Sequence, residues 1–124
     1  MSLELQGLDH VALSVLDQAA SAKWYQEVLG LERVYEDAWG EIPVMLVAHG
    51  TVLRCSRRES RRRGRRRSGS FTWHFGWIAR TSDAAQRTLA EHGIPFELQD
   101  HVVAHSMYFT DPDGHRLELT TYEL

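Results

Sequence analysis

The chain has 124 residues, a length that suits one compact domain, and 43% of them are hydrophobic, which is enough for a core. No apolar run approaches the length of a membrane span, no signal-peptide pattern opens the chain, and the single cysteine, Cys55, excludes an internal disulfide; we therefore expect a cytoplasmic protein without a membrane partner. The net charge of −3 conceals one basic segment, residues 56–70, beside a remainder with a net charge of −10, and an acidic domain of this kind is not typical of nucleic-acid-binding proteins.

The first half of the chain opens with a predicted strand followed by a predicted helix. The run "HVALSV" from His10 alternates apolar and polar residues, which is typical of a half-buried strand. Asp17 is a suitable N-cap for a helix over "QAASAKWYQEVL", and Gly30 is a suitable stop. The apolar stripe predicted for this helix consists of Ala20, Trp24 and Val28.

Further strands follow this helix. The stretch "LERVYED", residues 31–37, predicts one strand, and "VMLVAHGTVLRC", residues 44–55, predicts two strands that turn near Gly50. The first half therefore has the order strand, helix, then three strands.

The segment 56–70 interrupts this pattern with eight arginines and one glutamate. Such a block does not fold alone, because like charges repel and nothing in it is apolar. Three interpretations stay open: a mobile loop between the two halves, a tract that binds a polyanion, or the product of a local frame shift in the gene. No function is inferred from this segment.

The second half repeats the order of the first. The run "HFGWIA" from His74 predicts a strand, and Ser82 or Asp83 is a suitable cap for a helix that ends near Gly93. Ala85 and Leu89 form the stripe of this helix. Strands are then expected in "IPFELQD" and on both sides of the Pro112-Asp113-Gly114 turn within "SMYFTDPDGHRLEL".

The two halves align with an offset of 62 to 64 residues, which places Arg54 over Glu118. The alignment predicts an α+β fold of two βαβββ modules, residues 6–55 and 71–124 approximately, joined by residues 56–70. We expect the two modules to be related by a pseudo-twofold axis within a single domain, with curved mixed sheets that line a cleft.

Three polar residues lie on the faces of their strands that do not pack against the helices. His10 opposes the apolar face of the first strand, His74 that of the strand opening the second half, and Glu118 that of the last strand. The opposing apolar sets are Val11, Leu13 and Val15; Trp73, Phe75 and Trp77; and Leu117 and Leu119.

A strand histidine by itself is more often a hydrogen-bonded structural group, and a strand glutamate is more often solvated. The repeat changes this interpretation, because His10 and His74 occupy equivalent positions. Two imidazoles and one carboxylate form a ligand set for one divalent metal ion (Fe, Mn, Zn, Ni or Co) that leaves coordination positions open. Arg54 is not a ligand, so three protein ligands are expected: His10, His74 and Glu118.

The stretches "LDHVALSVLDQAASAKWYQEVLGLE", "WHFGWIA" and "SMYFTDPDGHRLEL" resemble the vicinal oxygen chelate superfamily. This superfamily includes glyoxalase I, bleomycin-resistance proteins, extradiol dioxygenases, methylmalonyl-CoA epimerases and fosfomycin-resistance enzymes. The resemblance implies paired βαβββ modules around an open cleft, a homodimer, and metal ligands at the positions of His10, His74 and Glu118.

The resemblance also bears on the reaction. Glyoxalase I enzymes place a fourth ligand on the strand that holds Arg54, which argues against a strict glyoxalase I. Fosfomycin-resistance enzymes carry a threonine where this chain has Ala12. Extradiol dioxygenases have a tyrosine on the strand before the carboxylate, and Tyr108 fits that place. Tyr108 is therefore a candidate phenol donor in the site, with core packing as the alternative.

The remaining histidines include two candidates for proton transfer. His101 and His105 lie in "DHVVAHS", and either is a candidate acid or base, although a surface role is the simpler alternative. We take His105, with Glu118 and Tyr108, as the catalytic set. The turn and helix-end positions of His49, His92 and His115 indicate structural roles.

Two main functions follow from these observations. The first is a metal-dependent enzyme acting on a small substrate with two adjacent oxygens, as an isomerase, lyase, thiol transferase or ring-cleaving dioxygenase. The alternative is a metal-free protein of the bleomycin-resistance type that binds an aromatic ligand, with which the four tryptophans are compatible. A third possibility is a structural member of the superfamily without activity.

Overall fold

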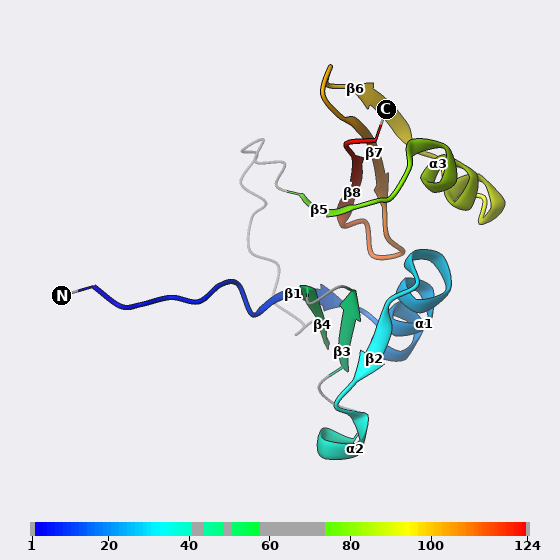
Figure 1. The fold of residues 1–124 in the computed structure, drawn as a ribbon. Coiled ribbons are helices and arrows are strands. Elements are labelled where there is room, and N and C mark those ends of the chain that lie inside the picture. Colours follow the sequence, from blue (N-terminus) through cyan, green and yellow to red (C-terminus); the bar gives the residue numbers. More distant parts are fainter. Residues whose placement is uncertain (1, 41–43, 49–50, 58–73, 124) are drawn as a thin grey trace, which may run out of the picture. The chain divides into compact units, whose positions relative to one another are not determined.

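The computed structural model describes residues 2–40, 44–48, 51–57 and 74–123. The chain divides into two compact units, residues 1–60 and 61–124 (Figure 1). Most of the arginine-rich segment, residues 58–70, lies outside the described residues. The three interpretations of this segment therefore stay predictions. No helix in the described part of the chain has both the length and the apolar character that crossing a membrane requires.

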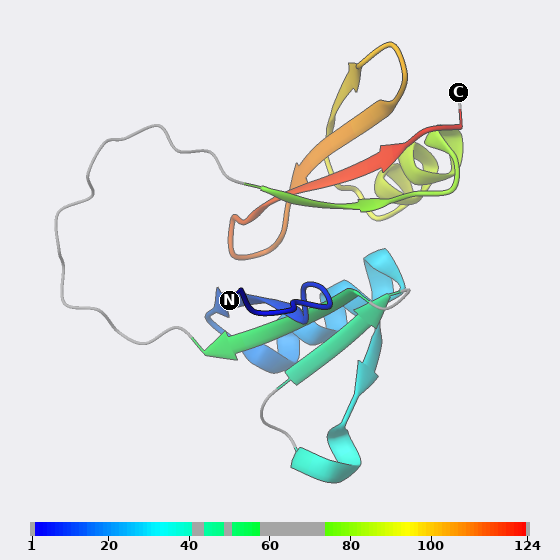
Figure 2. The same cartoon turned by 60° about the vertical axis from the view of Figure 1, so that its left-hand side comes forward.

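The described residues of the first unit form a four-stranded mixed sheet and two helices. The sheet has the order β1-β4-β3-β2, in which β1 is parallel to β4 and the other neighbours are antiparallel. Helix α1 packs against β3 and β4 (Figure 2). The elements are β1 (His10–Val15), α1 (Gln18–Leu29), β2 (Glu32–Val34), α2 (Glu36–Trp39), β3 (Val44–Ala48) and β4 (Thr51–Arg57).

The described residues of the second unit repeat this topology with one helix. Its sheet has the order β5-β8-β7-β6, with β5 parallel to β8, and α3 packs against β7 and β8 (Figure 2). The elements are β5 (Phe75–Ile78), α3 (Ser82–Glu91), β6 (Glu97–Asp100), β7 (His105–Thr110) and β8 (Arg116–Thr121). The predicted fold class, α+β with two βαβββ modules, is confirmed; the sheets are not closed. That the modules form one domain stays a prediction.

The strand registers match between the units. In the first unit Ala12 pairs with Arg54, and in the second Gly76 pairs with Glu118. Both residues of the second pair stand 64 positions after those of the first, so the predicted alignment of Arg54 with Glu118 is confirmed.

Helix α1 has the predicted ends but a different buried face. Asp17 accepts a hydrogen bond from the Ala20 amide at 3.0 Å, and Gly30 ends the helix in the left-handed conformation with φ of 69°. The predicted apolar stripe is wrong in part: Ala20 is exposed, and Tyr25 rather than Trp24 is fully buried. The helix buries Ser21, Ala22, Tyr25 and Val28.

Two further local predictions are corrected. The N-cap of α3 is Thr81, whose hydroxyl accepts from the Ala84 amide at 3.2 Å, rather than Ser82 or Asp83. The strand predicted over residues 31–37 ends at Val34, because Tyr35 takes a positive φ of 63° and starts the short helix α2.

Candidate functional site

The second sheet carries a polar cluster on the face that α3 does not cover. Glu118 lies on β8 between two neighbours, Gly76 on β5 and Tyr108 on β7. The adjacent residues Leu117 and Leu119 point to the other face, where Leu117 is fully buried. The apolar packing of β8 against the helix therefore directs the Glu118 carboxylate to the face opposite α3.

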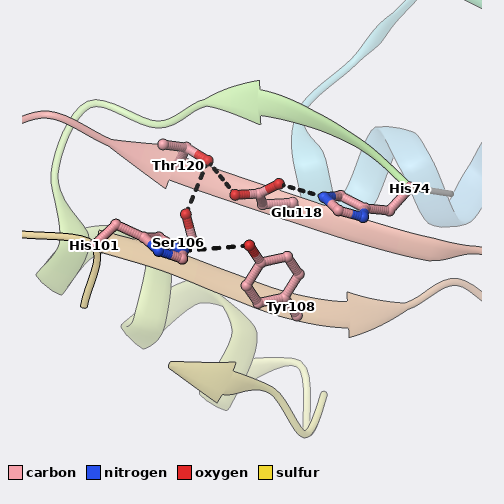
Figure 3. A network of polar contacts seen from close by, with 6 residues as sticks. All are labelled: His74, His101, Ser106, Tyr108, Glu118 and Thr120. Carbon is pink, nitrogen blue, oxygen red and sulfur yellow. Dashed lines mark hydrogen bonds and ion pairs between the residues drawn. The ribbon is translucent and has the colours of Figure 1, made fainter. Parts of the chain in front are cut away.

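Hydrogen bonds hold both oxygens of this carboxylate (Figure 3). His74, immediately before β5, places its Nε2 atom 2.9 Å from Oε2 of Glu118. The Thr120 hydroxyl donates to Oε1 at 2.7 Å. Because this bond uses the only hydroxyl proton of Thr120, the Ser106 hydroxyl donates to Thr120 Oγ1 at 3.2 Å. A directed chain thus runs from Ser106 through Thr120 to Glu118.

Tyr108 lies beside the pair formed by His74 and Glu118. Its ring makes an edge contact with the His74 ring, with centroids 5.3 Å apart, and the Arg116 guanidinium lies 4.9 Å from the Tyr108 centroid. The Tyr108 hydroxyl is 3.4 Å from Nε2 of His101 (Figure 3). An aromatic ring thus borders the pair and places a phenol close to a second imidazole.

The turn that carries His101 has an unusual backbone. The amide of Val103 donates to the His101 carbonyl at 2.8 Å, which closes a γ-turn around Val102. Val102 has φ of 72°, which is unfavourable for a β-branched residue, and its own amide donates to the Asp100 carboxylate at 2.8 Å. This strained turn positions the His101 ring at the edge of the cluster.

The surroundings set the charge of the two acidic groups. Burial acts to raise the pKa of Glu118, but hydrogen bonding outweighs burial, so this pKa lies below its usual value. The pKa of Tyr108 is raised, first by burial and then by the negative charge of Glu118. At neutral pH the carboxylate is therefore ionised and the phenol keeps its proton. The groups that lower the Glu118 pKa are Ser106, Thr120, Tyr108 and His74.

His10 belongs to the first unit and is described by its own surroundings. It begins β1, and its Nδ1 atom lies 2.6 Å from the Asp9 carboxylate. The structure brings His74, Glu118 and Tyr108 together in the second unit. That His10 joins them stays a prediction; among the described residues, no group of three or more His, Cys, Asp or Glu side chains is placed so as to hold a metal ion.

His105 does not lie at the cluster. It occupies the same face of β7 as the buried residues Met107 and Phe109, opposite to Tyr108, and its Nε2 atom is 3.9 Å from the Asp100 carboxylate. His101, the other histidine of "DHVVAHS", is the one that contacts Tyr108.

The other histidines lie away from the cluster or outside the described residues. The His92 ring hydrogen-bonds the Thr88 carbonyl at 2.9 Å, near the end of α3. His115 lies in the turn between β7 and β8. His49 lies outside the described residues.

The equivalent position of the first unit has different chemistry. Arg54 occupies the place of Glu118, and its register partner Met45 occupies the place of Tyr108. Nε of Arg54 is buried and lacks a hydrogen-bond partner among the described residues. The polar cluster around Glu118 thus belongs to the second half of the repeat.

Sequence reasoning missed Ser106, Thr120 and Gly76. Strand alternation already places Ser106 on the Tyr108 face of β7 and Thr120 on the Glu118 face of β8. The missing information was the register, which pairs Ser106 with Thr120 and Gly76 with Glu118.

Comparison with known proteins decides the family. The sequence model described as Glyoxalase/Bleomycin resistance protein/Dioxygenase superfamily matches residues 7–119. The chain belongs to this superfamily. The predicted resemblance is therefore confirmed at the level of the family.

Individual members of this superfamily show how far the likeness extends. The glutathione transferase FosA of Serratia marcescens is 29% identical, over 93% of this chain and 80% of the relative. Among solved structures, a glyoxalase/dioxygenase from Nostoc punctiforme has a TM-score of 0.78 at 21% identity, covering 100% of this chain and 99% of the other. The fosfomycin resistance protein FosX from Listeria monocytogenes has a TM-score of 0.73 at 19% identity, covering 98% and 97%. These structural likenesses establish the fold.

Proposed function

We propose that this superfamily member is a divalent-metal-dependent enzyme that acts on a small molecule with two adjacent oxygens. The proposed metal ligands are His10, His74 and Glu118. The observation that carries the proposal is the His74–Glu118 pair, an imidazole nitrogen and a carboxylate oxygen 2.9 Å apart on the sheet face that α3 does not cover.

The separation of these two atoms fits a shared ion. Two ligand atoms that each lie about 2.1 Å from one metal ion at a right angle are about 3.0 Å apart. The low pKa of Glu118 supports the same role, because a carboxylate must be ionised to bind a cation. Imidazole and carboxylate together suit Fe, Mn, Co, Ni and Zn ions.

The surroundings of His10 support its role as the third ligand. Its Nδ1 atom is engaged by Asp9, so a neutral ring with the proton on Nδ1 keeps Nε2 available for an ion. A carboxylate behind a ligating histidine is a common feature of metal sites, where it fixes the tautomer and raises the basicity of the ligand.

Each remaining polar group has a proposed task. A divalent ion held by His10, His74 and Glu118 would act as a Lewis acid that stabilises negative charge on the substrate oxygens. Thr120 and Ser106 keep the Glu118 carboxylate oriented. Tyr108, protonated at neutral pH, donates a hydrogen bond to substrate. The proposal does not extend to His105, because its ring lies on the opposite face of the sheet.

Among the possible reactions, thiol transfer has the most direct support. The curated relative FosA is named a glutathione transferase, and the likeness covers 93% of this chain. Isomerase, lyase and ring-cleaving dioxygenase reactions use the same chelation, and Ala12 distinguishes this chain from the fosfomycin-resistance pattern. We also propose that the protein is a cytoplasmic homodimer.

Metal analysis tests the proposal directly. Protein purified without chelators is expected to contain one first-row divalent ion per chain, and the His74→Ala variant is expected to lose it. The matched control is His92→Ala, since His92 is an exposed histidine at a helix end. A folded wild-type protein that takes up no such ion would contradict the enzyme and favour the metal-free binding protein.

A further inference from the structure

Gly76 differs from the other glycines in the described part of the chain. Its φ lies outside the positive range, so its backbone conformation is open to any residue. The other described glycines all have positive φ, and a Cβ added to any of them meets nothing within 4 Å: Gly7, Gly30, Gly40, Gly93 and Gly114. The backbone therefore does not explain glycine at position 76.

The space around Gly76 gives the explanation. A Cβ atom at this position would lie 3.0 Å from the carbonyl oxygen of Glu118, 3.1 Å from its Cβ and 3.5 Å from its Cγ. The first two distances are shorter than ordinary van der Waals contacts. Gly76 and Glu118 are direct partners in the parallel ladder between β5 and β8, so this contact is part of the sheet register.

The direction of the Glu118 side chain makes the contact relevant to the cluster. His74 lies two residues before Gly76 and therefore on the same side of the chain. Oε2 of Glu118 reaches Nε2 of His74 at 2.9 Å, and the base of the same side chain, Cβ and Cγ, runs beside the position where a residue-76 Cβ would stand. In the first unit Ala12 and Arg54 occupy the positions of Gly76 and Glu118, so a residue with a Cβ stands where there is no carboxylate to position.

We propose that Gly76 is a positioning residue, whose missing side chain gives Glu118 the room to approach His74. A Cβ at position 76 presses on the carbonyl oxygen and the Cβ of Glu118, neither of which moves when the Glu118 side chain rotates, so the β5 and β8 backbones at this pair must move apart by about a few tenths of an ångström. This displacement carries the Glu118 side chain away from His74. The geometric part of this inference is independent of metal, and its consequence for metal binding rests on the proposed function.

Two measurements on the Gly76→Ala variant test the inference. A crystal structure of the metal-free variant gives the distance between His74 Nε2 and Glu118 Oε2, which is expected to be longer than the 2.9 Å of the wild type. Titration with Mn²⁺, followed by electron paramagnetic resonance, is expected to give about tenfold weaker binding than wild type. The matched control is Ile78→Ala, since Ile78 is the next residue on the same face of β5 and is 80% exposed. This control is expected to keep the wild-type distance and affinity.

The outcomes separate this inference from the proposed function. Unchanged His74–Glu118 geometry in Gly76→Ala overturns the inference, whatever the metal titration shows. If wild-type protein binds none of Mn²⁺, Fe²⁺, Co²⁺, Ni²⁺ and Zn²⁺ but Gly76→Ala separates the pair, the inference stands and the proposed function fails. If Gly76→Ala has a lower Tm but keeps His74 and Glu118 in contact, Gly76 has a purely structural role, and this outcome also overturns the inference.

A second variant covers the case in which Gly76→Ala does not fold. Glu118→Gly removes the Cβ and Cγ atoms that residue 76 would meet at 3.1 and 3.5 Å. In that background Gly76→Ala is expected to be tolerated, with a smaller loss of Tm than in wild type. An equal loss in both backgrounds would show that the defect does not involve the Glu118 side chain and would overturn the inference.

Discussion

Replacing Thr120 by valine isolates the hydrogen bonding that orients Glu118. Valine keeps the β-branched shape of threonine and its preference for strands, so the change removes a hydroxyl with little effect on packing. The hydroxyl donates to Glu118 Oε1 at 2.7 Å and accepts from Ser106 at 3.2 Å. Both bonds are lost in Thr120→Val.

The expected cost follows from these two bonds. A hydrogen bond to a charged group contributes about 1.5 to 3 kcal/mol, and the lower end applies because the Glu118 side chain is 16% exposed to water. Ser106 is 1% exposed, so its hydroxyl loses an acceptor with little access to water, which costs about 1 kcal/mol more. Allowing for the favourable burial of a methyl group, we expect Thr120→Val to lower the free energy of unfolding by about 2 kcal/mol.

Urea denaturation of the metal-free protein at neutral pH measures this loss. The control is Thr110→Val, because Thr110 is an exposed threonine on the face of β7 that also carries Ser106 and Tyr108. This control is expected to change the free energy of unfolding by less than about 0.5 kcal/mol. At acid pH, where Glu118 is protonated, the difference between Thr120→Val and wild type is expected to shrink. A Thr120→Val variant as stable as wild type, or one equally weakened at both pH values, would refute the chain of hydrogen bonds as a support for the carboxylate.

Two other changes test the charge of the site and the strain beside it. Because the pKa of Glu118 is lower in the folded than in the unfolded protein, its contribution to stability is present above about pH 4.3 and is lost as the pH falls through the folded value. Glu118→Gln is therefore expected to reduce the loss of stability on acidification, measured as Tm against pH, and an unchanged acid limb would contradict this. Val102→Gly relieves a positive φ of 72° at a residue that is 84% exposed. Relief of about 1 to 3 kcal/mol of strain exceeds the entropic cost of glycine, about 0.5 to 1 kcal/mol, so Val102→Gly is expected to stabilise the protein by about 1 kcal/mol in urea denaturation. A destabilised variant would show that the γ-turn is not strained.

The topology of each module was predictable because it depends on patterns that repeat along the chain. Alternation of apolar residues located β1 and β8, and the Asp17 and Gly30 signals bounded α1. The offset of the repeat then supplied a long-range relation, the equivalence of Arg54 and Glu118, which a single strand does not contain.

Local backbone choices were harder to predict. The positive φ of Tyr35, which shortens β2 and starts α2, has no glycine to signal it. The buried face of α1 was misjudged because Trp24 and Tyr25 are adjacent aromatic residues. Which of them enters the core depends on how the helix is rotated against β3 and β4, and that rotation is a property of the packed unit.

Two of the three proposed metal ligands lie in one module, and the third lies in the other. The sequence therefore supports the two kinds of ligand by different arguments. His74 and Glu118 are brought together by the pairing of β5 with β8, within the second unit, and their contact is a local consequence of its register. His10 stands at the equivalent place of the other module, beside a strand that carries Arg54. Its role therefore rests on the symmetry of the repeat.

The duplicated modules share their backbone plan and differ in the polar residues placed on it. Ala12, Met45 and Arg54 hold the positions that Gly76, Tyr108 and Glu118 hold in the second module. Each replacement removes one element of the cluster: the open space beside the acid, the phenol, and the acid itself. Because the backbone pairing is the same in both units, sheet geometry alone does not create the site. The specific contribution of the second module is an acid with enough room to reach its neighbouring histidine.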